Sequence, residues 1–236
     1  MDKTPEEGSI YVLAGVDKVR FRKRLVPGDE VHLFSKVINS KNGRKFLEKF
    51  KNDFWLDLKI NDIPQTAMSA IDSLKDLKKC KYITVHASGG LEMMKAVKNE
   101  AKKINKNIKI LGVTVLTSLN DISIKQIGHT RKVKELVLKQ AGLVKKSSCD
   151  GIVCSAQEAK IVRKKYKKLL IITPGIRLPG DSSNDQMRVM TPKDAFKSKV
   201  NGVVIGRSLT KENIKNNIRR LLDHLNKWSR VVKFVE

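Results

Sequence analysis

From residue 54 onward, short apolar runs alternate with longer amphipathic segments, and this alternation constrains the fold more than any other feature of the sequence. The runs are rich in β-branched residues and cover 54–59, 82–86, 108–116, 151–154, 169–173 and 202–205. Segments with helical periodicity separate them, at 66–79, 90–104, 130–147, 156–167 and 191–199. The runs are continuously apolar, as in parallel strands that helices cover on both faces. The pattern predicts an α/β fold, either a (β/α)8 barrel or a doubly wound parallel sheet.

The first fifty residues have a different pattern. Residues 11–14 have the composition of a strand, and 16–21 and 31–37 alternate apolar and polar side chains with a period of two. Pro27-Gly28-Asp29 lies between the last two segments and predicts a turn. We therefore expect an antiparallel hairpin here, where a barrel normally begins with a strand, a helix and a second strand.

The charge balance of the chain is strongly basic. Its 236 residues include 49 Lys and Arg against 24 Asp and Glu, which gives a formal net charge of +25. Nucleic-acid binders and proteins with anionic substrates share such an excess. Here the lysines are dispersed along helical segments, and aromatic residues make up 5% of the chain. We therefore favour solvated helix surfaces over a specific nucleic-acid interface.

The sequence also limits the cellular setting and the metal chemistry that we expect. No apolar run approaches the ~18 residues of a membrane span, and the N-terminal residues form no secretory signal. The three cysteines, Cys80, Cys149 and Cys154, form no CxxC pair, so we expect neither a disulfide framework nor a zinc site. The histidines lack metal-ligand spacing. These features predict a cytoplasmic protein without a metal site and without a membrane partner.

Polar and glycine-rich residues follow the predicted strands, and Asp57, Lys59 and Asp62 form the most informative cluster among them. Asp57 and Lys59 are two residues apart at the end of a buried strand, so their side chains project to the same side, and Asp62 follows in the loop. Two carboxylates beside an ammonium in a partly dry pocket would keep one another charged. The lysine would then serve as a general acid toward a carbanion. The alternative is a surface ion-pair cluster at a strand end.

The segment DLKINDIPQT resembles the D-x-K-x-x-D-I-P-x-T motif of the orotidine 5′-phosphate decarboxylase family. Three more segments resemble this family in the same order: LTS at 116–118, TPGIR followed by DQMRVMTP at 173–192, and VIGRS at 204–208. Together they extend the resemblance over about residues 39–228. It implies a (β/α)8 TIM barrel that converts orotidine 5′-phosphate to UMP in pyrimidine biosynthesis and needs no cofactor.

The resemblance also implies a role for each matching residue. Lys59 would protonate C6 after the carboxylate is lost, with Asp57 beside it. Asp62, with Ile63 and Thr66, would reach the active site of a partner subunit, which implies a homodimer. Substrate-binding roles fall to Thr117 and Ser118 at the pyrimidine, to Arg177, Gly206 and Arg207 at the 5′-phosphate, to Gln186 in the loop that closes over it, and to Pro174.

Residues 10–38 depart from the family pattern. The segments AGVDKVRFR and VPGD instead resemble a strand–turn–strand piece of the β-hydroxyacyl-acyl-carrier-protein dehydratase family, outside that family's catalytic His and Glu. We expect an atypical N-terminal hairpin segment over 1–38, a junction near 36–40 and a decarboxylase-like barrel domain over 39–230. The first βα unit is then atypical, and whether the barrel is complete stays open.

This departure leaves the activity open as well. The family's first strand carries an aspartate and its second strand a lysine, and Asp17 and Lys36 are the candidates to replace them. Lys36 is therefore counted among the substrate-binding residues. Besides an active decarboxylase, the alternatives are an impaired or inactive phosphate-binding barrel, a Mg²⁺-dependent sugar-phosphate decarboxylase or synthase relative, and a nucleic-acid-binding module. The block at 186–192 argues against the Mg²⁺-dependent relatives.

Overall fold

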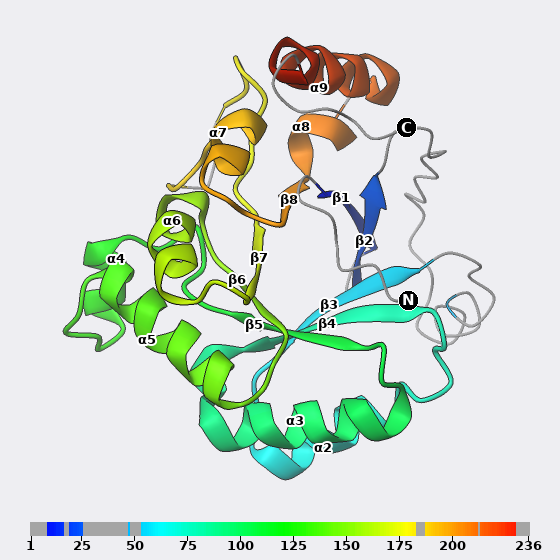
Figure 1. The fold of residues 1–236 in the computed structure, drawn as a ribbon, viewed down its shortest axis with the longest axis vertical. Coiled ribbons are helices and arrows are strands. Elements are labelled where there is room, and N and C mark those ends of the chain that lie inside the picture. The colour runs from blue at the N-terminus through cyan, green and yellow to red at the C-terminus, as the bar shows by residue number, and fades with distance from the viewer. Residues whose placement is uncertain are drawn as a thin grey trace.

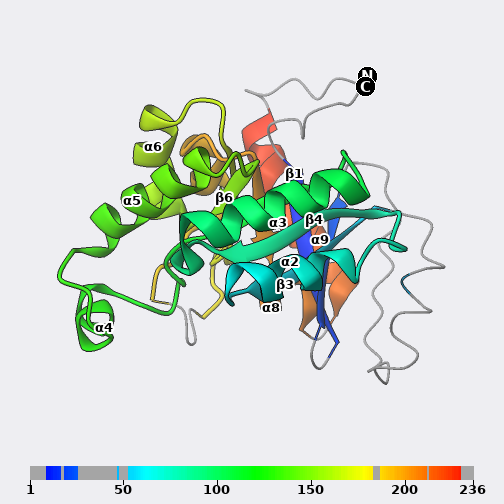
Figure 2. The ribbon, with the colours of Figure 1, turned by 90° about the horizontal axis from the view of Figure 1, so that it is seen from below.

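The computed structural model describes residues 9–16, 19–25, 47, 53–182, 187–211 and 213–229. In this part of the chain the strands pair in sequence order from β1 to β8, and β8 pairs with β1, so the ring of strands is closed. Helices that follow the strands lie on the outside of the ring (Figure 1, and from below in Figure 2). This arrangement is TIM-barrel-like, and it excludes the doubly wound sheet, whose edges stay open.

Six strands run parallel to one another and form most of the ring. Their neighbours in space are also their neighbours in sequence. They are β3 (Phe54–Ile60), β4 (Cys80–His86), β5 (Lys109–Val113), β6 (Gly151–Val153), β7 (Leu170–Thr173) and β8 (Gly202–Ile205). Each apolar run of the sequence overlaps one of them, so the predicted strands are confirmed.

The helices between these strands are confirmed too, with changed ends. They are α2 (Pro64–Asp72), α3 (Gly90–Ile104), α5 (Val133–Lys146), α6 (Ala156–Lys165) and α7 (Pro192–Lys197). The prediction for α2 was seven residues too long, because the chain continues after Asp72 in a series of turns. The sequence pattern missed the 3-10 turn η1 (Ala87–Gly89), α4 (Asp121–Gln126), α8 (Arg207–Thr210) and α9 (Ile214–Ser229).

An antiparallel hairpin completes the ring between β8 and β3. Its strands are β1 (Ser9–Val16) and β2 (Val19–Leu25), with Val16 opposite Val19. β1 is parallel to β8, whereas β2 is antiparallel to β3. The chain therefore has an N-terminal hairpin, but it differs from the predicted one, because the segment 16–21 that was predicted as one strand contains residues of both β1 and β2. The predicted turn at 27–29 and strand at 31–37 lie outside the described residues.

The strands bury side chains on both faces, which explains why their sequences are continuously apolar. Leu170 and Ile172 of β7 belong to a cluster with Trp55, Tyr82 and residues of the other parallel strands. Ile171, between them, belongs to the larger cluster under the helices. Successive residues of a strand point to opposite faces, so the first cluster fills the barrel and the second lies outside it. Each fully buried Ile or Leu stabilises the fold by roughly 1.5–3 kcal/mol.

Two further observations concern the cysteines and membranes. Cys80, Cys149 and Cys154 are free thiols and are buried, as small apolar core residues are. Burial raises the pKa of Cys149 to about 11, so its thiol is neutral at pH 7. Among the described residues, none of the helices is long and apolar enough to cross a membrane.

Candidate active site

The end of β3 carries the closest pair of opposite charges in the predicted site. The Nζ of Lys59 donates a hydrogen bond to Oδ2 of Asp57, and the two side chains form an ion pair. The Asp57 side chain is 1% exposed, whereas that of Lys59 is 26% exposed. A buried carboxylate therefore holds an ammonium that solvent or a ligand can reach. The predicted pairing of residues 57 and 59 is confirmed.

Thr84 of the neighbouring strand β4 contacts both members of this pair. Its Oγ1 donates a 2.8 Å hydrogen bond to Oδ1 of Asp57 and accepts a 3.0 Å hydrogen bond from the backbone N–H of Lys59. Thr84 is fully buried. One hydroxyl thus holds both the carboxylate of Asp57 and the backbone of Lys59 in place.

The backbone of β3 is irregular at the lysine. The register between β3 and β4 shifts between Leu56 and Ile60, and Lys59 has a φ of 50°. This left-handed conformation costs a residue with a Cβ roughly 1–2 kcal/mol. The strain is offset by the hydrogen bonds of Lys59 to Thr84 and Asp57. Strained residues of this kind cluster at functional sites.

His86, at the end of β4, lies close enough to Lys59 and Asp57 for their charges to change its pKa. Burial lowers the pKa of His86, and the positive charge of Lys59 lowers it further, against the opposing effect of Asp57. The imidazole is therefore neutral at pH 7, and it adds no second cation beside Lys59.

The residues predicted to reach a partner subunit lie on the surface just after β3. Asp62, Ile63 and Thr66 are exposed, and the Ile63 side chain is 67% exposed. Asp62 accepts a 2.7 Å hydrogen bond from the backbone N–H of Ile63, at the start of α2. Lys59 pairs with Asp57 of its own strand. The Asp62 carboxylate lies beyond the end of β3 and turns toward the start of α2, so its predicted place beside Lys59 remains a prediction.

The loop after β5 holds Thr117 and Ser118, and a buried arginine supports it. Thr117 is buried and Ser118 is exposed. Arg188 donates hydrogen bonds of 3.0 Å and 2.8 Å to the carbonyl oxygens of Val115 and Leu116. Its guanidinium also pairs with Glu158 of α6 at 2.6 Å. Arg188 therefore ties the loop after β7 to the backbone that presents Thr117.

A close backbone approach completes this connection. Gly175 has a φ of 77°, and a Cβ on it would lie 2.7 Å from the carbonyl oxygen of Arg188. A side chain at this position would collide with a backbone atom. Glycine therefore lets the two arms of the loop pair, and Gly175, Ile176 and Arg177 exchange backbone hydrogen bonds with Met190 or bridge to it. Pro174, partly buried, leads into this loop.

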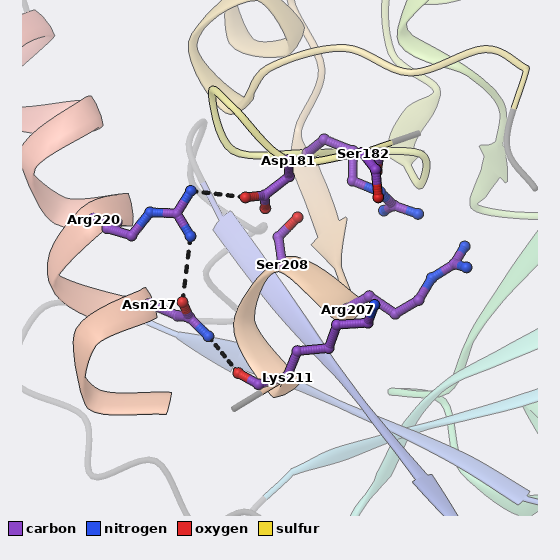
Figure 3. A pocket seen from close by; sticks show the side chains of 8 residues that line it. Asp181, Ser182, Arg207, Ser208, Lys211, Asn217 and Arg220 are labelled. Carbon is purple, nitrogen blue, oxygen red and sulfur yellow. Dashed lines mark hydrogen bonds and ion pairs between the residues drawn. The ribbon is translucent and has the colours of Figure 1, made fainter. Parts of the chain in front are cut away.

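Arg177 and Arg207, the predicted phosphate-binding residues, line one cavity of about 160 Å³ (Figure 3). Arg177 follows β7 and is 6% exposed, and Arg207 follows β8. Asp181, Ser182, Ser208, Lys211, Asn217 and Arg220 complete the lining. Four of the eight side chains are cationic at pH 7, so the cavity suits an anion with several oxygen atoms.

The helix that follows Gly206 contributes little to such a site. α8 contains four residues, Arg207–Thr210, and the N–H groups of Leu209 and Thr210 donate to the carbonyl oxygen of Gly206. A macrodipole needs several aligned peptide units, so one turn has little of it. Attraction for an anion comes here from the arginine side chains.

Three predicted positions lie outside the described residues. They are Lys36 and Asp17 in the N-terminal segment and Gln186 in the loop after β7. Within the described residues, no three or more His, Cys, Asp or Glu side chains gather as a metal site would require.

Known proteins with related sequences define the family. Residues 38–220 match the model of the orotidine 5′-phosphate decarboxylase / HUMPS family. The chain belongs to this family. Proteins named orotidine 5′-phosphate decarboxylase are among its relatives. The protein from Coxiella burnetii is 36% identical over 218 residues, 89% of this chain and 92% of the relative. The protein from Actinobacillus succinogenes is 44% identical over 168 residues, 70% of this chain and 72% of the relative.

Solved structures agree with this membership in the decarboxylase family. Orotidine 5′-phosphate decarboxylase from Lactobacillus acidophilus superposes with a TM-score of 0.61 at 32% identity, covering 73% of this chain and 75% of that one. The enzyme from Methanocaldococcus jannaschii, complexed with the inhibitor BMP, gives a TM-score of 0.60 at 23% identity, with coverages of 78% and 80%. This last likeness shows the fold alone.

Several residues that organise the site of this family member were not predicted from the sequence. Thr84, Arg188, Asp181 and Arg220 each join segments that are distant in sequence. Arg188 lies inside the motif DQMRVMTP, so the motif itself was a signal. Nothing local marked Thr84 or Arg220.

Proposed function

We propose that the protein is an orotidine 5′-phosphate decarboxylase that releases CO₂ and forms UMP in de novo pyrimidine synthesis. The observation that carries this proposal is the Lys59–Asp57 pair at the end of β3, on the same end of the barrel as the arginine-lined cavity after β7 and β8. In barrels of parallel strands the loops at the carboxyl ends form the active site. One end of the molecule thus offers both a proton donor and a site for a phosphate.

The chemistry follows from the charges at β3. When the bond between C6 and the carboxylate breaks, its electron pair remains on C6 and CO₂ leaves. The ammonium of Lys59 stabilises the developing negative charge and then donates a proton to C6, which forms the new C–H bond. Lys59 recovers its proton from water. Asp57, held by Thr84, keeps Lys59 protonated and in place between turnovers.

The 5′-phosphate supplies binding energy remote from the reacting carbon. Arg177 and Arg207 would bind it with charge-assisted hydrogen bonds. Thr117 and Ser118 would contact the pyrimidine, with Pro174 beside them, and Gly206 would approach the phosphate with its backbone. Binding energy from such a remote group can orient the reacting ring against Lys59. The assignment of these roles rests on the family motifs and on the positions described above.

We also propose a homodimer in which Asp62, Ile63 and Thr66 of one subunit reach the site of the other. Their exposure next to the site supports this arrangement, because residues at the surface of one subunit are accessible to a second copy. Asp62 of a second copy would then supply the carboxylate that Lys59 was expected to have as its second neighbour.

The N-terminal segment and its junction remain part of the proposal. The family match covers residues 38–220, and we place the junction between the atypical segment 1–38 and the decarboxylase-like residues 39–230 near its start. The comparisons do not support a dehydratase origin for residues 10–38. The hairpin β1–β2 closes the ring of strands, and Lys36 is proposed to supply the lysine of the family's second strand. A cytoplasmic location agrees with three free, buried thiols.

An assay of the purified chain tests the function directly. Orotidine 5′-phosphate consumption is followed by the loss of its ultraviolet absorbance, in the presence and absence of EDTA. We expect turnover that EDTA leaves unchanged. Turnover that EDTA abolishes would favour a Mg²⁺-dependent member of the family, and no consumption with retained UMP binding would favour an inactive phosphate-binding barrel.

A further inference from the structure

The cavity that holds Arg177 and Arg207 also contains a carboxylate, which a phosphate dianion would be expected to repel. Asp181 lines the cavity, and its side chain is 19% exposed. Burial by itself would raise the pKa of Asp181, but hydrogen bonds from Ser208 and Arg220 and the positive charge of Arg220 hold it below its usual value. Asp181 is therefore an anion at pH 7, and an anion site that contains it needs a way to neutralise it.

Arg220 of α9 provides this neutralisation. Its guanidinium donates a 2.7 Å hydrogen bond to Oδ1 of Asp181, which Figure 3 shows. It also donates a 3.2 Å hydrogen bond to the carbonyl oxygen of Pro179. The guanidinium also contacts Asn217 at 3.3 Å. Arg220 thus binds the loop 178–182 through both a side chain and the backbone.

The same loop is connected to both predicted phosphate-binding arginines. The Nε of Arg177 donates a 3.2 Å hydrogen bond to the carbonyl oxygen of Ser182. On the other side, Ser208, next to Arg207, accepts a 3.4 Å hydrogen bond from the backbone N–H of Leu178, and it lies close enough to Asp181 to lower the pKa of that carboxyl. Movement of Asp181 would therefore disturb the neighbours of both arginines.

α9 is itself fixed to the barrel, so it can serve as an anchor. Leu221 and Leu225 are buried against the core. Asn217 donates hydrogen bonds of 2.6 Å and 3.4 Å to the carbonyl oxygens of Lys211 and Leu209, at the end of α8. Arg220 is therefore held on a packed helix, and its partner Asp181 lies on the loop that this helix supports.

We propose that Arg220 is a positioning residue for the substrate's phosphate group: it neutralises Asp181 and holds the loop 178–182 in the conformation in which Arg177 and Arg207 accept a phosphate monoester. This inference rests on the proposed function only in its identification of the ligand. Because the Arg220 side chain is 46% exposed, its ion pair adds little to the stability of the fold, and variants at this position should fold.

Binding of UMP and of uridine, which lacks the phosphate, tests the proposal by calorimetry. Arg220→Gln should weaken UMP binding by about tenfold and leave uridine binding unchanged, because a carboxylate would then face the phosphate without compensation. In turnover, KM should rise by a similar factor while kcat changes less than about twofold, as expected when ground-state and transition-state binding fall together. Arg220→Lys should restore most of the UMP affinity.

Two further variants separate this role from a general structural one. Arg219→Gln removes the same charge from the adjacent, exposed position of α9 and should bind UMP like the parent protein. Adding Asp181→Asn to Arg220→Gln removes the uncompensated carboxylate, so UMP affinity should return to within about threefold of Asp181→Asn alone. Equal UMP binding by the Arg220→Gln and Arg219→Gln variants, or equal losses for UMP and uridine, would overturn the proposal. If UMP affinity depends on Arg220 as predicted but the protein does not consume orotidine 5′-phosphate, the decarboxylase function is refuted and the positioning role of Arg220 is retained.

Discussion

Thr84 donates a 2.8 Å hydrogen bond to the carboxylate of Asp57 from the next strand of the barrel, and both side chains are buried. The same hydroxyl oxygen accepts the backbone N–H of Lys59. A charged pair whose carboxylate is fixed by a second strand needs no rearrangement when charge develops on the substrate. Preorganisation of this kind is a large contribution to electrostatic catalysis.

Replacing Thr84 by Val should keep the shape of the side chain and remove this hydrogen bond. Asp57 would then lose a buried donor, which costs about 1.5–3 kcal/mol for a charged group. We expect kcat for orotidine 5′-phosphate to fall by about 10–100-fold, measured from the loss of absorbance. Thr114→Val is the matched control, since that buried hydroxyl donates to the carbonyl oxygen of Val153 and should leave kcat within a few-fold of the parent. Comparable kcat losses in the two variants would contradict the role given to Thr84.

Lys59→Ala should abolish decarboxylation while the protein remains folded. The variant removes the proton donor and also the ammonium that pairs with the buried Asp57 carboxylate, and Ala keeps the Cβ that is strained at this φ. The melting temperature should therefore fall, while the fold is retained. Turnover is compared with that of Lys95→Ala, which removes an exposed lysine of α3. Substantial residual turnover in the Lys59→Ala protein would remove Lys59 from the mechanism.

Arg207→Ala should weaken phosphate-bearing ligands by about 2–3 kcal/mol, the contribution of a charge-assisted hydrogen-bonded contact. Calorimetry with UMP measures the loss, and uridine serves as the phosphate-free reference. Arg131→Ala removes an exposed arginine from the loop between α4 and α5 and should leave the affinity unchanged. An unaltered UMP affinity in the Arg207→Ala protein would show that its phosphate site lies elsewhere.

The sequence predicted those features that depend on neighbouring residues. Apolar runs with helical segments between them gave all six parallel strands, because burial on both faces leaves a continuous pattern. The spacing of Asp57 and Lys59 gave their pairing, since residues two apart in a strand share a face. Alternation failed as a guide in the hairpin, because residues 16–21 alternate apolar and polar side chains as one strand would. No residue type in this segment indicates that Val16 ends one strand and Val19 begins the next.

Contacts between distant segments carry no comparable local mark. Thr84 is 27 residues from Asp57, and Arg220 is 39 residues from Asp181. Their side chains meet only because the ring of strands brings β3 beside β4, and because α9 packs near the loop after β7. Hydrophobic periodicity reports which face of an element is buried, and it does not report which polar side chain on another element completes a hydrogen bond.

The neutral state of His86 predicts a pH dependence of stability. Since the folded-state pKa is lowered, the unfolded chain binds a proton below about pH 6.5 that the folded chain does not yet bind. The contribution of His86 is therefore complete above pH 6.5 and is lost as the pH falls toward the folded-state pKa. Urea unfolding of the parent and of His86→Asn between pH 5 and 8 measures this contribution, and the variant should lose less stability on acidification. An equal slope in both proteins would show that His86 titrates normally.

The pair formed by Arg188 and Glu158 offers a direct comparison of buried and exposed charges in one molecule. Both of its side chains are 7% exposed, and burial raises the pKa of Glu158 against the opposing effect of Arg188. Arg188→Met leaves Glu158 buried without its guanidinium and frees the carbonyl oxygens of Val115 and Leu116, so unfolding should become easier by about 3–5 kcal/mol. Arg131→Met breaks the exposed pair with Glu135 and should cost at most ~1 kcal/mol. Urea titrations give both values, and adding Glu158→Gln to Arg188→Met should recover part of the loss because no buried charge then remains. Equal losses of unfolding free energy in Arg188→Met and Arg131→Met would contradict this. They would show that the Arg188–Glu158 pair does not hold the loops after β5 and β7 together.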